Sequence, residues 1–353
     1  MMSWDGHRMK KILKRNEFYV SVVVVSLIVL IQAKSGQFFT ANNLVDLARS
    51  CILPGILTLG VMVEITAHSI DVSFPAIAMI TMYTVTEAAT TGNYTGPVWL
   101  LFAAAAVMGT SLGAVNGLFA AWLKLPTLII TLATSSIYMG VMQGVLKCRV
   151  IATMAQPLAR LSKTYLFVAT NMESGLTSPL SILFLLLIAV IALVGFLMRF
   201  TMLGRGIYAF GGDPVAARRV GFNVAGIQVF VFAFMGCLAG VGGLTRTVLT
   251  GSCQPTTLEG YEMICIAAAV LGGTRLLGGV GTVKGALLGV LLMMIISNNL
   301  ILLGIPTYWS KFVTGVFIIL GIGISSYQVL RGQRTFSASV LKSGLPAREE
   351  ARL

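Results

Sequence analysis

Residues 98–121 read VWLLFAAAAVMGTSLGAVNGLFAA, an apolar run without a charged side chain. An α-helix of about 20 such residues is long enough to cross the hydrocarbon core of a bilayer. The run therefore predicts a transmembrane helix. Gly109, Gly113 and Gly117 recur along it at helical spacing, so they share one face on which another helix backbone can approach closely.

The composition extends this prediction to the whole chain. Of its 353 residues, 56% are hydrophobic and only 10% are charged, against about 25% charged residues in an ordinary soluble domain. The mean hydropathy is +0.89. So few charges cannot cover so much apolar surface in water. We therefore predict an all-α membrane protein with about ten transmembrane helices.

The expected spans follow from the apolar runs between charged or turn-forming segments. They are residues 17–33, 51–69, 71–89, 98–121, 127–146, 178–198, 225–246, 261–274, 284–303 and 309–328. The stretch 51–89 is nearly continuous, but Asp71 and Pro75 interrupt it and predict a broken helix there.

The basic residues predict the orientation. The net charge is +13, and most of the 25 lysines and arginines fall in segments that these spans place on one side. Such an excess marks the cytoplasmic side. The tails 1–16 and 329–353 are therefore expected in the cytoplasm, flanking a transmembrane domain of residues 17–328, and the 147–177 segment faces the other side. Without aromatic residues between the basic ones, nucleic acid is not an expected partner, whereas membrane lipid is.

Motifs that carry nucleotide or zinc chemistry are absent. The chain contains neither GxxxxGK[ST] nor HExxH, and its only histidines are His7 and His68. We therefore expect no catalytic residue, no metal site and no cofactor in this chain.

One group of ionisable residues lies inside the apolar runs. Glu64, His68 and Asp71 have spacings that a continuous helix would place on one face. Ionisable groups at membrane depth usually face a cavity or a bundle interior. They fit a metal site, a proton-coupled transport site, or a polar lining at a helix break beside a solute path. The interruption at Asp71 and Pro75 favours the last of these interpretations.

A second informative stretch lies between two expected spans, at residues 204–221. Gly211 and Gly212 predict a turn, Asp213 suits a helix N-cap, and Pro214 suits the first helical position. A short helix should follow and end at Gly221 in a left-handed cap.

Two functions fit such a short cytoplasmic helix. It could dock to a partner protein. Alternatively, it could lie on the membrane surface with Arg218 and Arg219 against lipid phosphates. The physical properties of the residues leave both interpretations open.

The same stretch is part of a wider resemblance to a known family. GRGIYAFGGDPVAARRVGFNV (204–224), GYEMICIAAAVLGGTRLLGGVGTVKGALLGVLL (260–292) and NNLILLGIPTYWSKFVTGVFIIL (298–320) resemble the permease subunit of sugar-type bacterial ABC importers, the ribose, xylose and autoinducer-2 group. NGLFAAWLKLPTLIITLATSSIYMGV (116–141) is similar to the fourth and fifth spans of that family. The resemblance covers about residues 40–328.

The resemblance implies the ABC importer permease fold in the bacterial inner membrane. It implies a second permease subunit, identical or different, and a periplasmic sugar-binding protein. A cytoplasmic ABC ATPase would hold the ATP and Mg. The implied solute is a monosaccharide or a related polyol. The alternative is a proton-coupled secondary transporter that uses Glu64, His68 and Asp71.

The resemblance also favours docking as the role of the 213–221 segment, because a cytoplasmic coupling helix in such importers sits in a cleft of the ATPase. The expected coupling residues are Asp213, Pro214, Ala216, Ala217, Arg218 and Gly221. Ala216 and Ala217 are expected to enter the cleft because they are small.

The expected residues of the solute path or its gate are polar residues within the spans, namely Asp71, Ser73, Asn116 and Asn298. Hydrogen bonds between helices of one subunit would explain them equally well. The family usually has Gly-Gly-Ile-Asp-Leu-Ser-Val-Gly where this chain has residues 68–75. Ile70, Asp71 and Ser73 keep that pattern, whereas His68 and Pro75 depart from it.

Overall fold

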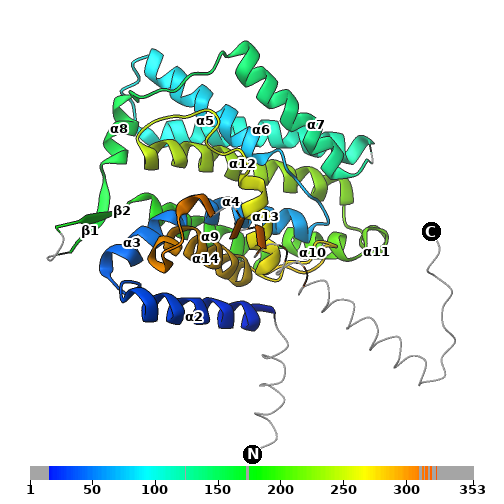
Figure 1. Cartoon of the computed structure of the whole chain (residues 1–353). Coiled ribbons are helices and arrows are strands. Elements are labelled where there is room, and N and C mark those ends of the chain that lie inside the picture. The colour runs from blue at the N-terminus through cyan, green and yellow to red at the C-terminus, as the bar shows by residue number, and fades with distance from the viewer. Residues whose placement is uncertain are drawn as a thin grey trace, which may run out of the picture.

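The computed structural model describes residues 16–123, 125–171 and 175–309, together with residues 312, 313, 315, 316, 319 and 323. Both predicted tails, except residue 16, and most of the expected span 309–328 lie outside the described residues. Within them the chain is mainly α-helical. The long helices lie side by side in two layers, with α5, α6, α7 and α12 in one and α4, α9, α13 and α14 in the other (Figure 1).

The helices have the following bounds: α2 (Asn16–Ser35), α3 (Ala41–Ser50), α4 (Ile52–Thr66), α5 (Phe74–Thr91), α6 (Val98–Leu123), α7 (Thr127–Gly140), α8 (Gln156–Ser162), α9 (Leu183–Phe200), α10 (Met202–Gly212), α11 (Pro214–Arg219), α12 (Val224–Thr250), α13 (Tyr261–Leu271) and α14 (Val283–Asn299). A π-helical turn, η1 (Val141–Val145), extends α7, and two short 3-10 turns, η2 (Ile301–Leu303) and η3 (Thr307–Trp309), follow α14.

Several of these helices are suited to a membrane. Among the described residues, α2, α6, α7 with η1, α9 and α12 are long and apolar enough to cross it. The pair α3 and α4 forms a sixth candidate that is bent by 41°. The helices α13 and α14 are apolar but shorter. The prediction of a helical membrane protein is therefore confirmed, whereas length and composition alone do not establish ten spans.

The burial pattern agrees with a lipid-facing exterior. Large apolar side chains are exposed on the outer helices, for example Val107, Leu118 and Phe196. In contrast, every residue of α4 is buried, from Ile52 to Thr66. A helix that is apolar all round is suited to the centre of a bundle. The helix α4 therefore forms the centre of the packing.

The predicted glycine face of α6 and a second glycine position, on α14, form close helix contacts. Gly109 and Gly113 of α6 lie against the backbone of α12 at Gly236, and a side chain there would overlap it. Gly289 of α14 lies in the same way against Ala268 of α13. Without side chains at these positions, the two backbones can approach closely, and dispersion contacts between them replace the missing hydrophobic driving force.

The expected span 178–198 begins too early. The segment before α9 forms an antiparallel hairpin of β1 (Tyr165–Thr170) and β2 (Thr177–Ser181), and α9 starts only at Leu183. Pro179 and its polar neighbours disfavour a helix there. Asn42 of α3 anchors the hairpin by donating from Nδ2 to the Leu176 carbonyl (3.0 Å) and to Ser178 Oγ (3.2 Å).

The two ends of the bundle carry different structures. At one end, on the right in Figure 1, lie α10, α11 and the start of α2. At the opposite end lie the β hairpin and α8. These are called the α11 end and the α8 end below.

Candidate functional site

The predicted helix break lies between α4 and α5. The helix α4 ends at Thr66, and α5 starts at Phe74 with Pro75 in its first turn. Pro75 is tolerated in that position because the first amides of a helix have no intrahelical acceptor. His68 adopts a left-handed backbone conformation, with φ of 56°, and this takes the chain away from the α4 axis. The break is confirmed, and residues 67–73 form the linker.

A buried hydrogen-bond network starts in this linker. Asp71 Oδ1 accepts from the backbone N and the Oγ of Ser73, each at 2.6 Å. Ser73 Oγ accepts from Asn116 Nδ2 at 2.6 Å, and Asn116 Oδ1 accepts from the Tyr138 hydroxyl at 3.1 Å. All four residues are buried. The network therefore connects the break to α6 and α7 inside the bundle.

Threonines of α7 hold the linker backbone. Thr127 Oγ1 accepts from the Ile70 amide at 3.0 Å, and Thr131 Oγ1 accepts from the Val72 amide at 3.3 Å. These amides lie in a segment without helical partners. Leaving a buried amide unpaired costs about 1–3 kcal/mol in a protein interior, and more in lipid. The α7 hydroxyls therefore satisfy backbone amides of the linker that have no helical partner.

Glu64 adds a second carboxyl group to the network. Its two oxygens and Asp71 Oδ2 are buried and have no donor among the described residues. The carboxyl groups of Glu64 and Asp71 interact in the same buried interior, where two ionised carboxylates would repel each other.

His68 does not join these carboxyl groups. Its side chain is exposed, and its Nδ1 lies 2.8 Å from the Leu277 carbonyl oxygen. Glu64, His68 and Asp71 therefore do not converge. In the described part of the chain, no group of three His, Cys, Asp or Glu side chains is arranged to hold a metal ion.

The structure brings together three of the four predicted path residues. Asp71, Ser73 and Asn116 share the network, whereas Asn298 is exposed on α14 and donates to Ser50 Oγ at 2.5 Å. Sequence reasoning missed Tyr138, Thr127 and Thr131. Their signal was available, because these polar residues recur on one face of an apolar helix.

The short helix α11 follows its predicted design at both ends. Asp213 Oδ1 accepts from the amides of Val215 (2.8 Å) and Ala216 (3.0 Å), and Pro214 occupies the first turn. Gly221 has a φ of +96°, which favours glycine, after the helix has ended. The predicted N-cap, proline position and left-handed glycine are confirmed.

The predicted turn at Gly211 and Gly212 is wrong. Both glycines are the last residues of α10, and the chain turns only at Asp213, whose backbone is extended. The helix continues through Gly211 because this residue packs against the end of α4.

The orientation of α11 also differs from the expectation. Ala217 is only 3% exposed and packs on the protein's own core, so its side chain does not project outward into a partner. Ala216 and Arg218 are exposed, and so are Val215 (60%) and Val220 (78%). The two valines are therefore the apolar side chains that α11 and the residue after it present outward.

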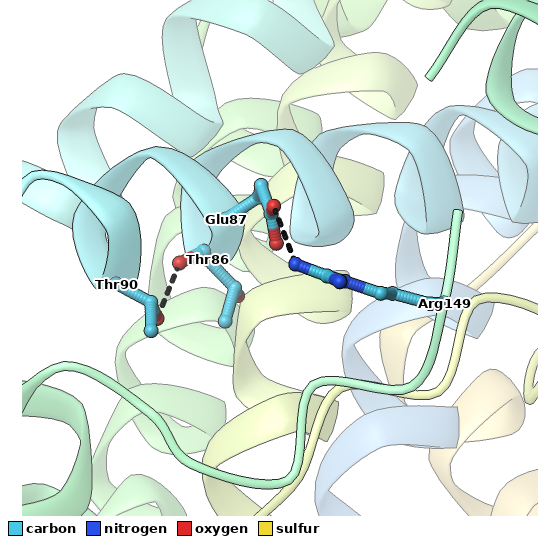
Figure 2. A network of polar contacts seen from close by, with 4 residues as sticks. All are labelled: Thr86, Glu87, Thr90 and Arg149. Carbon is cyan, nitrogen blue, oxygen red and sulfur yellow. Dashed lines mark hydrogen bonds and ion pairs between the residues drawn. The ribbon is translucent and has the colours of Figure 1, made fainter. Parts of the chain in front are cut away.

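The α8 end carries a smaller polar cluster (Figure 2). Arg149 Nη2 lies 3.9 Å from Glu87 Oε1 of α5, and the Thr90 hydroxyl donates to the Thr86 carbonyl at 2.7 Å. The ion pair is largely exposed, so its contribution to stability is small. Nearby, Ile151 and Cys253 exchange two backbone hydrogen bonds of 2.9 Å, and burial raises the pKa of the Cys253 thiol to about 11.

The chain combines a bundle of apolar helices, a buried polar break after α4 and a capped helix at one end, which suits a polytopic membrane protein. The chain belongs to the family described as the permease component of branched-chain amino acid transport systems, whose family model matches residues 43–322.

Individual relatives agree with this assignment. The chain is 30% identical over 306 residues to the ribose import permease protein RbsC of Haemophilus influenzae, covering 87% of this chain and 92% of that protein. It is 32% identical over 301 residues to the autoinducer 2 import system permease protein LsrC of Yersinia enterocolitica, covering 85% of this chain and 79% of that protein. The search of solved structures found no match. The predicted resemblance to the ribose and autoinducer-2 permeases is confirmed.

Proposed function

We propose that this chain is the transmembrane permease subunit of an ATP-driven importer for a monosaccharide or a related polyol. The observation that carries the proposal is the similarity, over most of both chains, to permeases named for ribose and autoinducer 2 import. The family model's description names branched-chain amino acids instead. These names therefore give two classes of solute to compare, sugars and branched-chain amino acids.

The proposal includes ten spans with both termini in the bacterial cytoplasm. The broken pair α3 and α4, the helix α5 and the shorter α13 and α14 would add to the clear spans, and the tenth falls at 309–328. The common position of α11 and the start of α2 at one end supports this arrangement (Figure 1). Arg218 and Arg219 lie at that same end, in keeping with the positive-inside bias.

Coupling to the ATPase is assigned to α11. Its capping groups are satisfied locally, so it is rigid before a partner binds, and its outward side chains are exposed. Preorganised helices lose little entropy on docking. ATP and Mg would be held by the ATPase, while this chain moves the solute.

The path is assigned to an interface with a second permease subunit. The central helix α4 is buried along its length, and the network around Asp71 is enclosed by α6 and α7. These polar groups hold the break together rather than line an open channel within the described residues. A solute delivered by a periplasmic binding protein would therefore pass between two permeases, beside this network.

Reconstitution into proteoliposomes tests the proposal. The permease, the ATPase and the binding protein should accumulate labelled D-ribose only when ATP and Mg are present on the ATPase side. Accumulation driven by a proton gradient without ATP would contradict the proposal and support the secondary transporter with Glu64 and Asp71. ATP-driven uptake of labelled leucine but not of D-ribose would contradict the proposed solute class. It would leave the proposed ATP-driven mechanism standing.

A further inference from the structure

Three segments from different parts of the chain meet at the α11 end. They are the end of α4 at Thr66, the end of α10 at Gly211 and the loop 272–282 between α13 and α14. The helix α10 leads directly into α11. The end of α4 leads directly into the linker that contains Asp71. This meeting point therefore lies between the exposed helix and the buried network.

The neighbours of Gly211 at this point are backbone atoms. A methyl group at Gly211 would overlap the Thr66 carbonyl oxygen and would lie 2.7 Å from the Gly279 nitrogen. The Gly279 amide also donates to the Thr66 carbonyl at 2.9 Å. A methyl group at Gly278 would lie 2.5 Å from the Gly211 carbonyl oxygen. The backbones at Thr66, Gly211 and Gly279 are therefore in direct contact.

Two side chains reinforce the contact from its edges. The Tyr208 hydroxyl of α10 donates to the Gly281 carbonyl at 2.7 Å, and His68 Nδ1 lies 2.8 Å from the Leu277 carbonyl oxygen. Burial raises the pKa of Tyr208, so its hydroxyl stays protonated and remains a donor. The loop 272–282 is thereby tied to α10 on one side and to the end of α4 on the other.

We propose that Gly211 is a positioning residue that transmits movement of α10 and α11 to the helix break after α4. This inference rests on the proposed function, in which α11 receives the movement of the ATPase. Closely packed backbones resist compression, so α10 cannot shift toward α4 without moving Thr66. Thr66 begins the turn into the linker, and its displacement moves Asp71 and Ser73 relative to α6 and α7.

A matched pair of substitutions tests this role. Gly211→Ala and Gly212→Ala add the same methyl group to adjacent residues at the end of α10. At Gly212 this group meets nothing within 4 Å, whereas at Gly211 it overlaps the Thr66 carbonyl. Each variant is assembled with the ATPase and the binding protein in proteoliposomes, and D-ribose uptake and ATP hydrolysis are measured together.

The expected result is a change in the ratio of the two rates. Gly211→Ala should still co-purify with the ATPase, because α11 is unaltered, but its uptake per ATP should fall at least tenfold. Gly212→Ala should keep the wild-type ratio. Equal ratios in wild type and Gly211→Ala would overturn the proposal, and so would equal losses in both variants.

Two further measurements keep the test informative if Gly211→Ala assembles poorly. Tyr208→Phe removes one hydrogen bond without adding volume, so it should lower uptake per ATP about threefold while assembly is retained. Amide hydrogen exchange over residues 275–281 should rise in Gly211→Ala but not in Gly212→Ala. If wild type shows no ATP-driven uptake, the proposed function fails. Unchanged amide exchange in Gly211→Ala would contradict the close contact of Gly211 with Thr66 and the loop 272–282, whatever the transport result.

Discussion

Two aspartates interrupt helices in this protein by the same local geometry. Asp71 accepts from the backbone amide of Ser73, and Asp213 accepts from that of Val215, in each case two residues further along the chain. Each aspartate takes a second hydrogen bond on the same oxygen. Asp213 is exposed and its bonds stay within its own segment. Asp71 is 2% exposed, and its network continues into α6 and α7.

The two interruptions depend on different parts of the chain. The α11 turn is complete once its own six-residue helix forms, so its loss affects one surface element. The break after α4 needs donors and acceptors from distant segments, and removing one of them breaks buried hydrogen bonds. Such bonds are costly to lose in a low-dielectric interior. Substitutions at the two sites should therefore differ in how far their effects spread.

The largest effect is expected for Asn116→Leu. This substitution removes the bridge between Ser73 and Tyr138, and it should destabilise the protein by about 2–4 kcal/mol because two buried hydrogen bonds are lost from the network. D-ribose uptake should fall more than tenfold and the thermal midpoint of the purified protein should drop. Asn298→Leu is the control, since Asn298 is exposed. A similar thermal shift in both variants would show that the buried network contributes no more to stability than the exposed Asn298 does.

The next comparison separates the two sides of α11. Val215→Asp alters an exposed side chain, so stability should change by no more than about 0.5 kcal/mol, while ATPase binding weakens several-fold. Ala217→Trp overfills a buried position and should destabilise by about 1–3 kcal/mol. Pull-down of the ATPase and thermal unfolding distinguish these outcomes. Undiminished ATPase binding by Val215→Asp would remove this face of α11 from the docking surface.

A smaller effect is expected when either aspartate is replaced by asparagine, in two separate variants. Asp71→Asn keeps one oxygen for Ser73 and places an amide donor beside Glu64, so uptake should fall moderately, by about threefold. Asp213→Asn should remain near wild type, because asparagine caps helices about as well as aspartate. Initial rates of D-ribose uptake provide the measurement. Complete loss in an assembled Asp71→Asn transporter would instead point to a carboxyl group that must exchange protons.

The smallest effect is expected at His68. His68→Gly relieves a left-handed conformation that costs about 1 kcal/mol in most residues, but it removes the contact with Leu277. The thermal midpoint should therefore change little. His68→Val should lower it clearly, because a β-branched side chain resists positive φ. Equal midpoints for these two variants would contradict the left-handed backbone at this position.

Local chemistry made part of this architecture predictable. The cap at Asp213, the proline after it and the left-handed Gly221 depend on neighbouring residues, so a sequence reading identifies them. The break near Asp71 and Pro75 was predictable for the same reason. The family resemblance was also readable from contiguous stretches.

Features that depend on distant packing were not predictable in this way. The inward orientation of Ala217 depends on the core beneath α11, and the grouping of Tyr138 with Asn116 depends on how α6 and α7 cross. Asn298 has the same residue type and a similar apolar context, but the fold places it on the opposite side of α14 from the core. The β1 and β2 hairpin was missed because its strands are short and flank a loop.

The glycine contact between α6 and α12 has a consequence for the response of the protein to bilayer thickness. These helices have 26 and 27 residues, so each is about 40 Å long, whereas the hydrocarbon core is about 30 Å thick. Tilting adapts such helices to the lipid, and the close contact at Gly109 and Gly113 requires the two to tilt together. Because α12 begins just after α11, in the arrangement proposed above a thinner or thicker membrane would change the height at which α11 stands above the lipid surface.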